Sequence, residues 1–162
     1  MYECILSDQQ TTWKGNGINM EQKHSIAWHV PNLLSICIDS VADGEMSGEI
    51  YHCYSKEPLK FSNIIRMIET ADGFFDQIKF PQSATQMRSF EKREQMMETV
   101  PEKVCTPQEI LEKRGMKGTF LLNVKYRQNS SWQGVIQWVE GDVTYPFSSV
   151  LELLKILSNT MS

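Results

Sequence analysis

The pattern of apolar and polar positions follows the same order twice along this chain. When residues 33–72 are aligned without gaps on residues 119–158, alternating apolar positions coincide, and so do apolar positions with helical spacing. The alignment also matches a small set of identical residues, namely Gly48 with Gly134, Ile50 with Ile136, Phe61 with Phe147 and Ser62 with Ser148. Self-similarity of this kind is typical of a repeated structural unit.

The first copy predicts a β-hairpin followed by a helix. Residues 34–38 alternate as a strand does, Asp43 and Gly44 form a tight-turn dipeptide, and residues 49–54 predict the returning strand. A helix is then expected from Ser62, a suitable N-cap, to just before Pro81. Its apolar face consists of Ile64, Ile68, Ala71, Phe75 and Ile78.

The second copy predicts strands near residues 118–126 and 134–140 and a helix from about residue 148 to the end. Ser149 and Glu152 have the spacing of a capping box at the start of this helix. Its apolar face is wide, because only Glu152, Lys155 and Asn159 form a polar stripe. Either the sheet and the partner helix together cover this face, or a second copy of the chain does, which would make a homodimer.

These elements predict an α+β fold in which tandem duplicated ββα units form an antiparallel or mixed sheet with two long helices on one face. The expected organisation is an N-terminal strand and loop extension over residues 1–32, a first ββα unit over 33–80, a charged linker over 81–117 and a second ββα unit over 118–162. Within the linker, Thr106, Pro107 and Glu109 predict a short helix that runs to about Arg114.

Composition and charge narrow the class of protein. The chain has 162 residues, a formal net charge of −4 and no clustered basic face, which argues against nucleic acid as a partner. Four cysteines without close spacing predict reduced thiols and a cytoplasmic protein. The N-terminus lacks the pattern of a signal peptide, and no run of about 18 apolar residues predicts a membrane span.

Candidate catalytic and metal-binding residues are few. His52 and Cys53 are adjacent on a predicted strand, so their side chains point to opposite faces and do not share one ion. His24 and His29 fit no standard metal motif. A Cys-His nucleophile would require Cys37 or Cys105 to meet a histidine in space, which the sequence leaves open. We therefore expect no enzyme activity, no cofactor and no metal.

The densest cluster of polar and aromatic side chains lies where the second hairpin turns. The residues expected to bind a partner are Arg127, Gln128, Asn129, Ser131, Trp132 and Gln133. Together they offer a guanidinium, amides, a hydroxyl and an indole, which suit contact with a protein or a planar ligand. In the alternative interpretation the loop only forms the turn, Trp132 folds back on the sheet and Gly134 permits a bulge.

The same run resembles a motif in a group of small uncharacterised proteins of Gram-positive gut bacteria. Similar residues are found at Arg127–Gly134, at Ile136–Trp138 and from Phe147 to Val150, although Ser148 stands where many of those proteins have Arg. The resemblance extends more loosely over the first copy, including the segment from Phe80 to Gln82. It implies membership of that group and no particular activity.

A second, shorter resemblance suggests a nucleotide sensor. The pattern Asn129-x-Ser131-x-x-Gly134 is similar to the second motif of PilZ domains, which bind cyclic di-GMP with that segment and an upstream pair of arginines. Arg88 and Arg93 are the nearest arginines, and their spacing departs from the family pattern. The leading prediction is a non-enzymatic adaptor or regulatory protein that binds another protein through the second hairpin tip and the last helix. A small-molecule or cyclic-dinucleotide sensor is the alternative.

Overall fold

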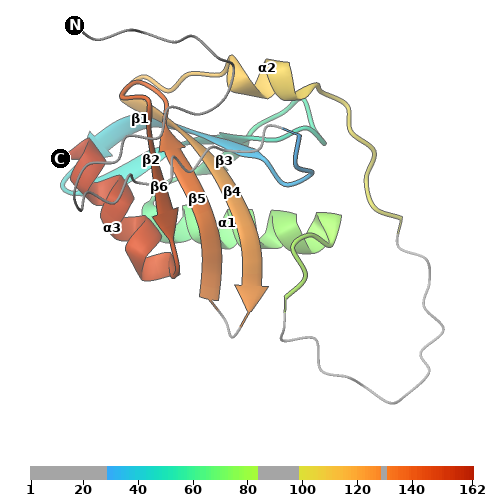
Figure 1. Cartoon of the computed structure of the whole chain (residues 1–162). Helices are drawn as coiled ribbons and strands as arrows, with labels where there is room; N and C mark the ends of the chain where they lie inside the picture. Colours follow the sequence, from blue (N-terminus) through green and yellow to red (C-terminus); the bar gives the residue numbers. More distant parts are fainter. Residues whose placement is uncertain (1–28, 84–98, 129–130) are drawn as a thin grey trace, which may run out of the picture.

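The computed structural model describes residues 29–83, 99–128 and 131–162, and their fold is α+β (Figure 1). Its elements are β1 (Leu34–Ala42), β2 (Glu45–Tyr51), β3 (Leu59–Phe61), α1 (Ile64–Ile78), α2 (Pro107–Leu111), β4 (Gly118–Gln128), β5 (Ser131–Trp138), β6 (Val143–Phe147) and α3 (Val150–Met161). The strands form one sheet in the order β3-β2-β1-β4-β5-β6, and all neighbouring strands are antiparallel. The predicted fold class is confirmed at this level.

One face of the sheet carries the main hydrophobic core and packs against α1 and α3. Alternate strand residues such as Ile36 and Leu122 are fully buried there, together with Phe75 from α1 and Leu153 from α3. Such alternation follows from the two-residue period of a strand, which sends successive side chains to opposite faces. A smaller cluster on the other face is formed by Leu33, Leu121 and Val135 with partly buried Val30, Leu111 and Val139.

Each half of the sheet contains three strands rather than the two that were predicted. The additional strands, β3 and β6, form the two edges of the sheet. β3 has only three residues, and β6 contains Pro146, which lacks a backbone N–H and is tolerated at a sheet edge. Both features weaken a sequence signal for a strand, so the predicted ββα units are in fact βββα arrangements.

Turns and helix caps were predicted more accurately than the edge strands. Asp43 and Gly44 both have positive φ, 52° and 79°, as a two-residue hairpin turn requires. The capping box of Thr106 and Glu109 is present at the start of α2. The N-cap of α1, however, is Asn63 rather than Ser62, and its side chain accepts a hydrogen bond from the Arg66 N–H.

The start of α3 also differs in detail from the prediction. The Ser149 side chain accepts a hydrogen bond from the Glu152 N–H, as in a capping box. The Glu152 carboxylate, however, accepts from the N–H and the hydroxyl of Ser148 rather than from Ser149. These bonds hold the pKa of Glu152 below its usual value.

The two halves share their strand register at an offset of 86 residues. Gly48 lies opposite Phe61 as Gly134 lies opposite Phe147, and the register of the central hairpins shifts just after Ile38 and just after Val124. Between the halves, Ser35 of β1 pairs with Leu121 of β4, which is its own equivalent position. The paired strands therefore meet around an approximate two-fold axis. Most of the predicted N-terminal extension, residues 1–28, lies outside the described residues, and so does the part of the predicted linker over residues 84–98.

Candidate functional site

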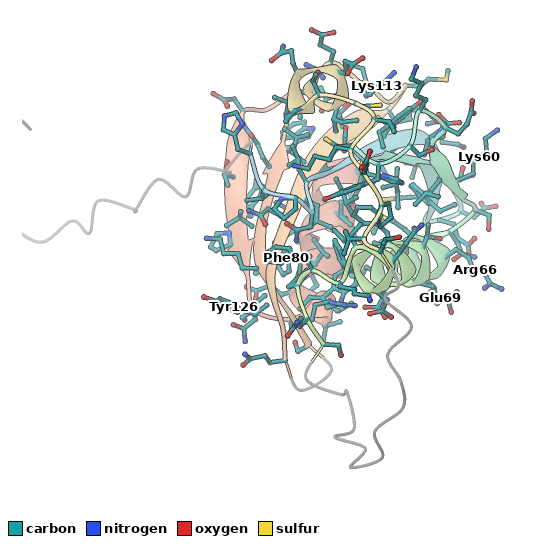
Figure 2. The ribbon with its side chains drawn as sticks, turned by 90° about the vertical axis from the view of Figure 1, so that its right-hand side faces the viewer. Lys60, Arg66, Glu69, Phe80, Lys113 and Tyr126 are labelled. Atoms are coloured by element: carbon teal, nitrogen blue, oxygen red, sulfur yellow. The ribbon has the colours of Figure 1, made fainter. Side chains whose placement is uncertain are left out.

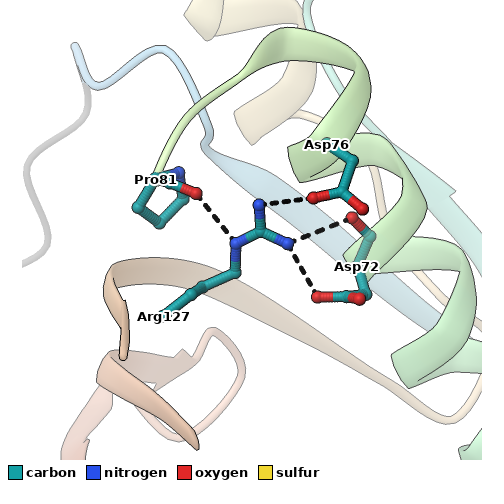
Figure 3. A network of polar contacts seen from close by, with 4 residues as sticks. All are labelled: Asp72, Asp76, Pro81 and Arg127. Carbon is teal, nitrogen blue, oxygen red and sulfur yellow. Dashed lines mark hydrogen bonds and ion pairs between the residues drawn. The ribbon is translucent and has the colours of Figure 1, made fainter. Parts of the chain in front are cut away.

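Arg127, near the end of β4, reaches across to the last turns of α1 (Figure 3). Its Nη1 and Nη2 donate to the carboxylates of Asp72 and Asp76 at 2.8 and 2.7 Å, and its Nε donates to the Pro81 carbonyl at 2.8 Å. The side chain is only 5% exposed. The guanidinium also lies 5.5 Å from the centroid of the Phe75 ring.

This network assigns Arg127 a structural role. Its charge is balanced by two carboxylates that remain half or more exposed, with relative side-chain exposures of 50% and 63%. A buried cation is tolerated when it is paired and hydrogen-bonded in this way. The prediction that this guanidinium faces a partner is therefore wrong, because the guanidinium is already committed to α1 and to the segment after it.

Trp132, on β5, is a core residue. Its side chain is 5% exposed, and its ring meets the Phe75 ring edge-on at 5.4 Å with an interplanar angle of 72°. This geometry is favourable for an aromatic pair. The expectation of an exposed indole at the hairpin tip is thus wrong. The structure agrees with the alternative interpretation on two points: Trp132 folds back on the sheet, and the bulge in β4 lies opposite Gly134. The turn itself, at residues 129–130, lies outside the described residues.

The remaining predicted binding residues differ in their exposure to solvent. Gln128 and Gln133 are exposed, whereas Ser131 is half-buried and its hydroxyl donates to the Ser148 carbonyl at 3.3 Å. Asn129 lies outside the described residues. The bond from Ser131 ties the start of β5 to the segment just before α3. The hairpin end and the start of the last helix are therefore neighbours.

The structure also brings together residues that the sequence did not single out as a site. A surface pocket of about 400 Å³, here called the tip pocket, is lined by Lys79, Phe80, Pro81, Gln82, Lys125, Tyr126, Arg127 and Gln128. Tyr126 is 56% exposed and Phe80 is 42% exposed. Figure 2 shows both on the same side of the molecule, away from Arg66 and Glu69. The resemblance motif contained Phe80, but nothing in the sequence placed it beside β4.

A second hollow lies directly beside the tip pocket. This helix groove has a volume of about 300 Å³ and is lined by Ile68, Glu69, Asp72, Ser83, Arg127, Ser131, Trp132 and Val150. It therefore runs between α1 and the first residue of α3. Arg127 contributes to the lining of both hollows.

Among the described residues, the histidine and cysteine candidates are not paired with one another, and His24 lies outside the described residues. His52 stacks on Phe74 at 4.3 Å, its Nδ1 accepts from the Tyr54 N–H, and burial lowers its pKa. Burial raises the pKa of Cys37 to about 11, which makes its thiol a poor nucleophile. Within the described ranges, no group of three or more His, Cys, Asp or Glu side chains could hold a metal ion.

Comparisons with known proteins give no relatives for this chain. No model of a protein family matches it, and no curated protein and no solved structure does so either. None of the helices in the described part of the chain is long and apolar enough to cross a bilayer.

Proposed function

We propose that this protein is a non-enzymatic binding module that recognises another protein through the tip pocket and the adjoining start of α3. The observation that carries this proposal is the pair of exposed aromatic side chains, Tyr126 and Phe80, on the lining of one pocket. Exposed aromatic side chains beside a pocket are typical anchors of protein–protein contacts, since they bury a large area with few rotatable bonds. Gln128 and Gln82 add amide groups at the same place.

The surroundings of the pocket favour a rigid contact surface. Tyr126 is adjacent to Arg127, whose three hydrogen-bonded nitrogens fix β4 against α1 and the Pro81 carbonyl. A preorganised surface loses less conformational entropy on binding than a mobile loop does. Val150, the first residue of α3, lines the helix groove, and the next residue, Leu151, is a further apolar side chain with 62% exposure.

The internal resemblance of the two halves supports a further part of this proposal, a tandem duplication. A βββα unit that pairs with its own copy through equivalent residues corresponds to a homodimer joined into one chain. In this account the second copy acquired the contact surface. We also propose that the chain belongs with the group of Gram-positive gut proteins that its motif resembles. A cytoplasmic location is proposed as well, since the described cysteines are free and free thiols are usual in that compartment.

Affinity capture with matched variants tests the proposal. Tyr126→Ala and Phe80→Ala should each lower the recovery of a partner by about tenfold, because they remove the proposed anchors. The control is Met116→Ala, which removes another exposed apolar side chain, at 84% exposure, and should leave recovery unchanged. Met116 lies just before the start of β4, whereas Tyr126 lies near its end. Equal recovery with all three variants would refute the proposed surface.

A small-molecule site is the second candidate, and one observation favours it. The tip pocket combines two aromatic rings with Lys79 and Lys125, a composition suited to a planar anion such as a nucleotide. The buried and paired state of Arg127 weighs against the PilZ-like mode, in which arginines contact phosphate. Titration with cyclic di-GMP, followed by calorimetry, would separate the two candidates: heat that is lost in Tyr126→Ala would favour the ligand.

A further inference from the structure

Cys53 and Cys105, which are far apart in the sequence, lie next to each other in the structure. The Cys105 N–H donates to the Cys53 carbonyl at 3.0 Å, and the Val104 N–H donates to the same oxygen at 2.7 Å. With standard bond lengths on either side of that hydrogen bond, the two Cα atoms are at most about 7 Å apart, and any bend in the path shortens this. Disulfides join Cα atoms up to about 6.8 Å apart.

The side chains share the same local environment. The Cys105 thiol donates to the Ser55 carbonyl at 3.5 Å, so it points into the turn that begins at Cys53. Burial is the main reason that the pKa of Cys53 is raised, and the negative charge of an ionised Cys105 raises it further. Lys103 acts in the opposite direction. Both cysteines therefore lie at the turn that begins at Cys53.

We propose that Cys53 and Cys105 form a reversible disulfide when the protein meets a peroxide. Cys105 is the more exposed of the two, so its thiolate attacks the peroxide oxygen, and the O–O bond breaks to give a sulfenic acid and water. The Cys53 thiolate then attacks the Cys105 sulfur, the S–S bond forms and the hydroxyl leaves as a second water. In total, two thiols are oxidised and one hydrogen peroxide is reduced to two waters.

The disulfide would tie the segment that leads into α2 to the turn after β2. Both segments border the first half of the sheet, and α2 buries Ile110 next to them. Oxidation therefore stabilises the attachment of α2 by removing conformations from the unfolded chain. No pattern in the sequence predicts this pair, because the two cysteines belong to different predicted elements.

Peptide mapping of the full chain under non-reducing conditions tests the proposal. Hydrogen peroxide should produce a single cross-linked species that joins the peptides of Cys53 and Cys105, with a loss of two hydrogens that dithiothreitol reverses. Oxidation should also raise the midpoint of thermal unfolding by several degrees. In Cys37→Ser the cross-link should persist, whereas in Cys105→Ser both the cross-link and the thermal shift should be lost.

Other oxidation products would contradict the proposal. A link from Cys105 to Cys4 or Cys37, or a Cys105 oxidised to sulfinic acid while Cys53 stays reduced, would overturn the assignment. Circular dichroism of the reduced Cys105→Ser protein should match that of the reduced wild type, so the absence of a cross-link in this variant reports the missing thiol.

Discussion

The β1–β2 and β4–β5 hairpins, which extend to opposite ends of the sheet, share their strand register and differ in their side chains. At the end formed by β4 and β5, Arg127 pairs with α1 and Trp132 packs on Phe75. At the end formed by β1 and β2, the positions 86 residues earlier hold Val41 and Met46, both of which pack in or against the main core. One end is thus aliphatic, whereas the other carries an ion-pair network and an aromatic pair.

This difference separates what the fold requires at both ends from what only one end carries. The shared register and the shared glycines are needed at both ends, because the strands approach closely there. The tip pocket and its exposed Tyr126 have no such explanation, and Ser40 stands at the equivalent position of the first half. A side chain that the fold does not need, at one end only, is the feature expected of a contact residue.

The largest expected effect concerns the aromatic pair. Trp132→Ala should lower the free energy of unfolding by about 3–5 kcal/mol, because it removes a large buried ring and leaves a cavity. Urea unfolding measures this loss. A double-mutant cycle with Phe75→Leu should show a coupling of about 0.5–1.5 kcal/mol. A loss near zero for Trp132→Ala would place the indole at the surface and undo the comparison of the two ends.

The glycines should behave alike at both ends. An added Cβ would meet the Cys37 carbonyl oxygen at 1.9 Å in Gly48→Ala and the Asn123 carbonyl oxygen at 2.1 Å in Gly134→Ala. Both variants should lose about 1–3 kcal/mol or more of unfolding free energy, because the backbone of the neighbouring strand has to move. The control is Gly73→Ala in α1, where a Cβ meets nothing within 4 Å and should raise helix stability. Unequal losses at Gly48 and Gly134 would break the structural equivalence.

The ion-pair network should contribute less than the aromatic pair. Arg127→Met should cost about 1–3 kcal/mol of unfolding free energy, since it removes charged hydrogen bonds and keeps much of the packing. Asp72→Asn and Asp76→Asn should each cost about 1 kcal/mol or less, because both carboxylates are well exposed and screened by solvent. Chemical denaturation at low and high salt checks both statements. If Arg127→Met proved as stable as the wild type, Arg127 would not anchor β4.

The smallest effect is a dependence on pH that belongs to the first half alone. His52 occupies the position that Trp138 holds in the second half, and burial lowers the pKa of His52 in the folded state. Folding therefore favours the neutral ring, so this contribution to stability is complete above about pH 6.5 and is lost as the pH falls below that value. The unfolding free energy of His52→Phe, compared with that of the wild type from pH 7.5 to 5, isolates this slope. Parallel curves would remove His52 as its source.

Local signals in the sequence predicted much of the fold. The Asp43-Gly44 turn and the capping box at Thr106 depend on neighbouring residues, so the sequence contains the whole signal. The edge strands were missed because β3 is short and β6 contains Pro146. Edge strands pair on one side only, so they need fewer of the residues that mark a strand.

The candidate site was harder to predict because its partners are distant along the chain. The composition around Trp132 favoured a contact loop, but Asp72, Asp76 and Phe75 decide where Arg127 and Trp132 point, and they belong to another element. In a regular strand Tyr126 would lie on the same face as the buried Val124. The bulge in β4 instead leaves Tyr126 exposed, on the lining of the pocket that also contains Phe80. No periodicity in the sequence predicts a contact between side chains from elements so far apart in the chain.

Site-specific photo-cross-linking tests the central claim, that the end formed by β4 and β5 is the contact surface. A benzophenone side chain is placed at Tyr126 in one variant and at Ser40, the exposed equivalent position, in another. Irradiation in the native cells should give a discrete cross-linked protein from position 126 and none from position 40. Cross-links of equal yield from both positions, or from position 40 alone, would contradict the account.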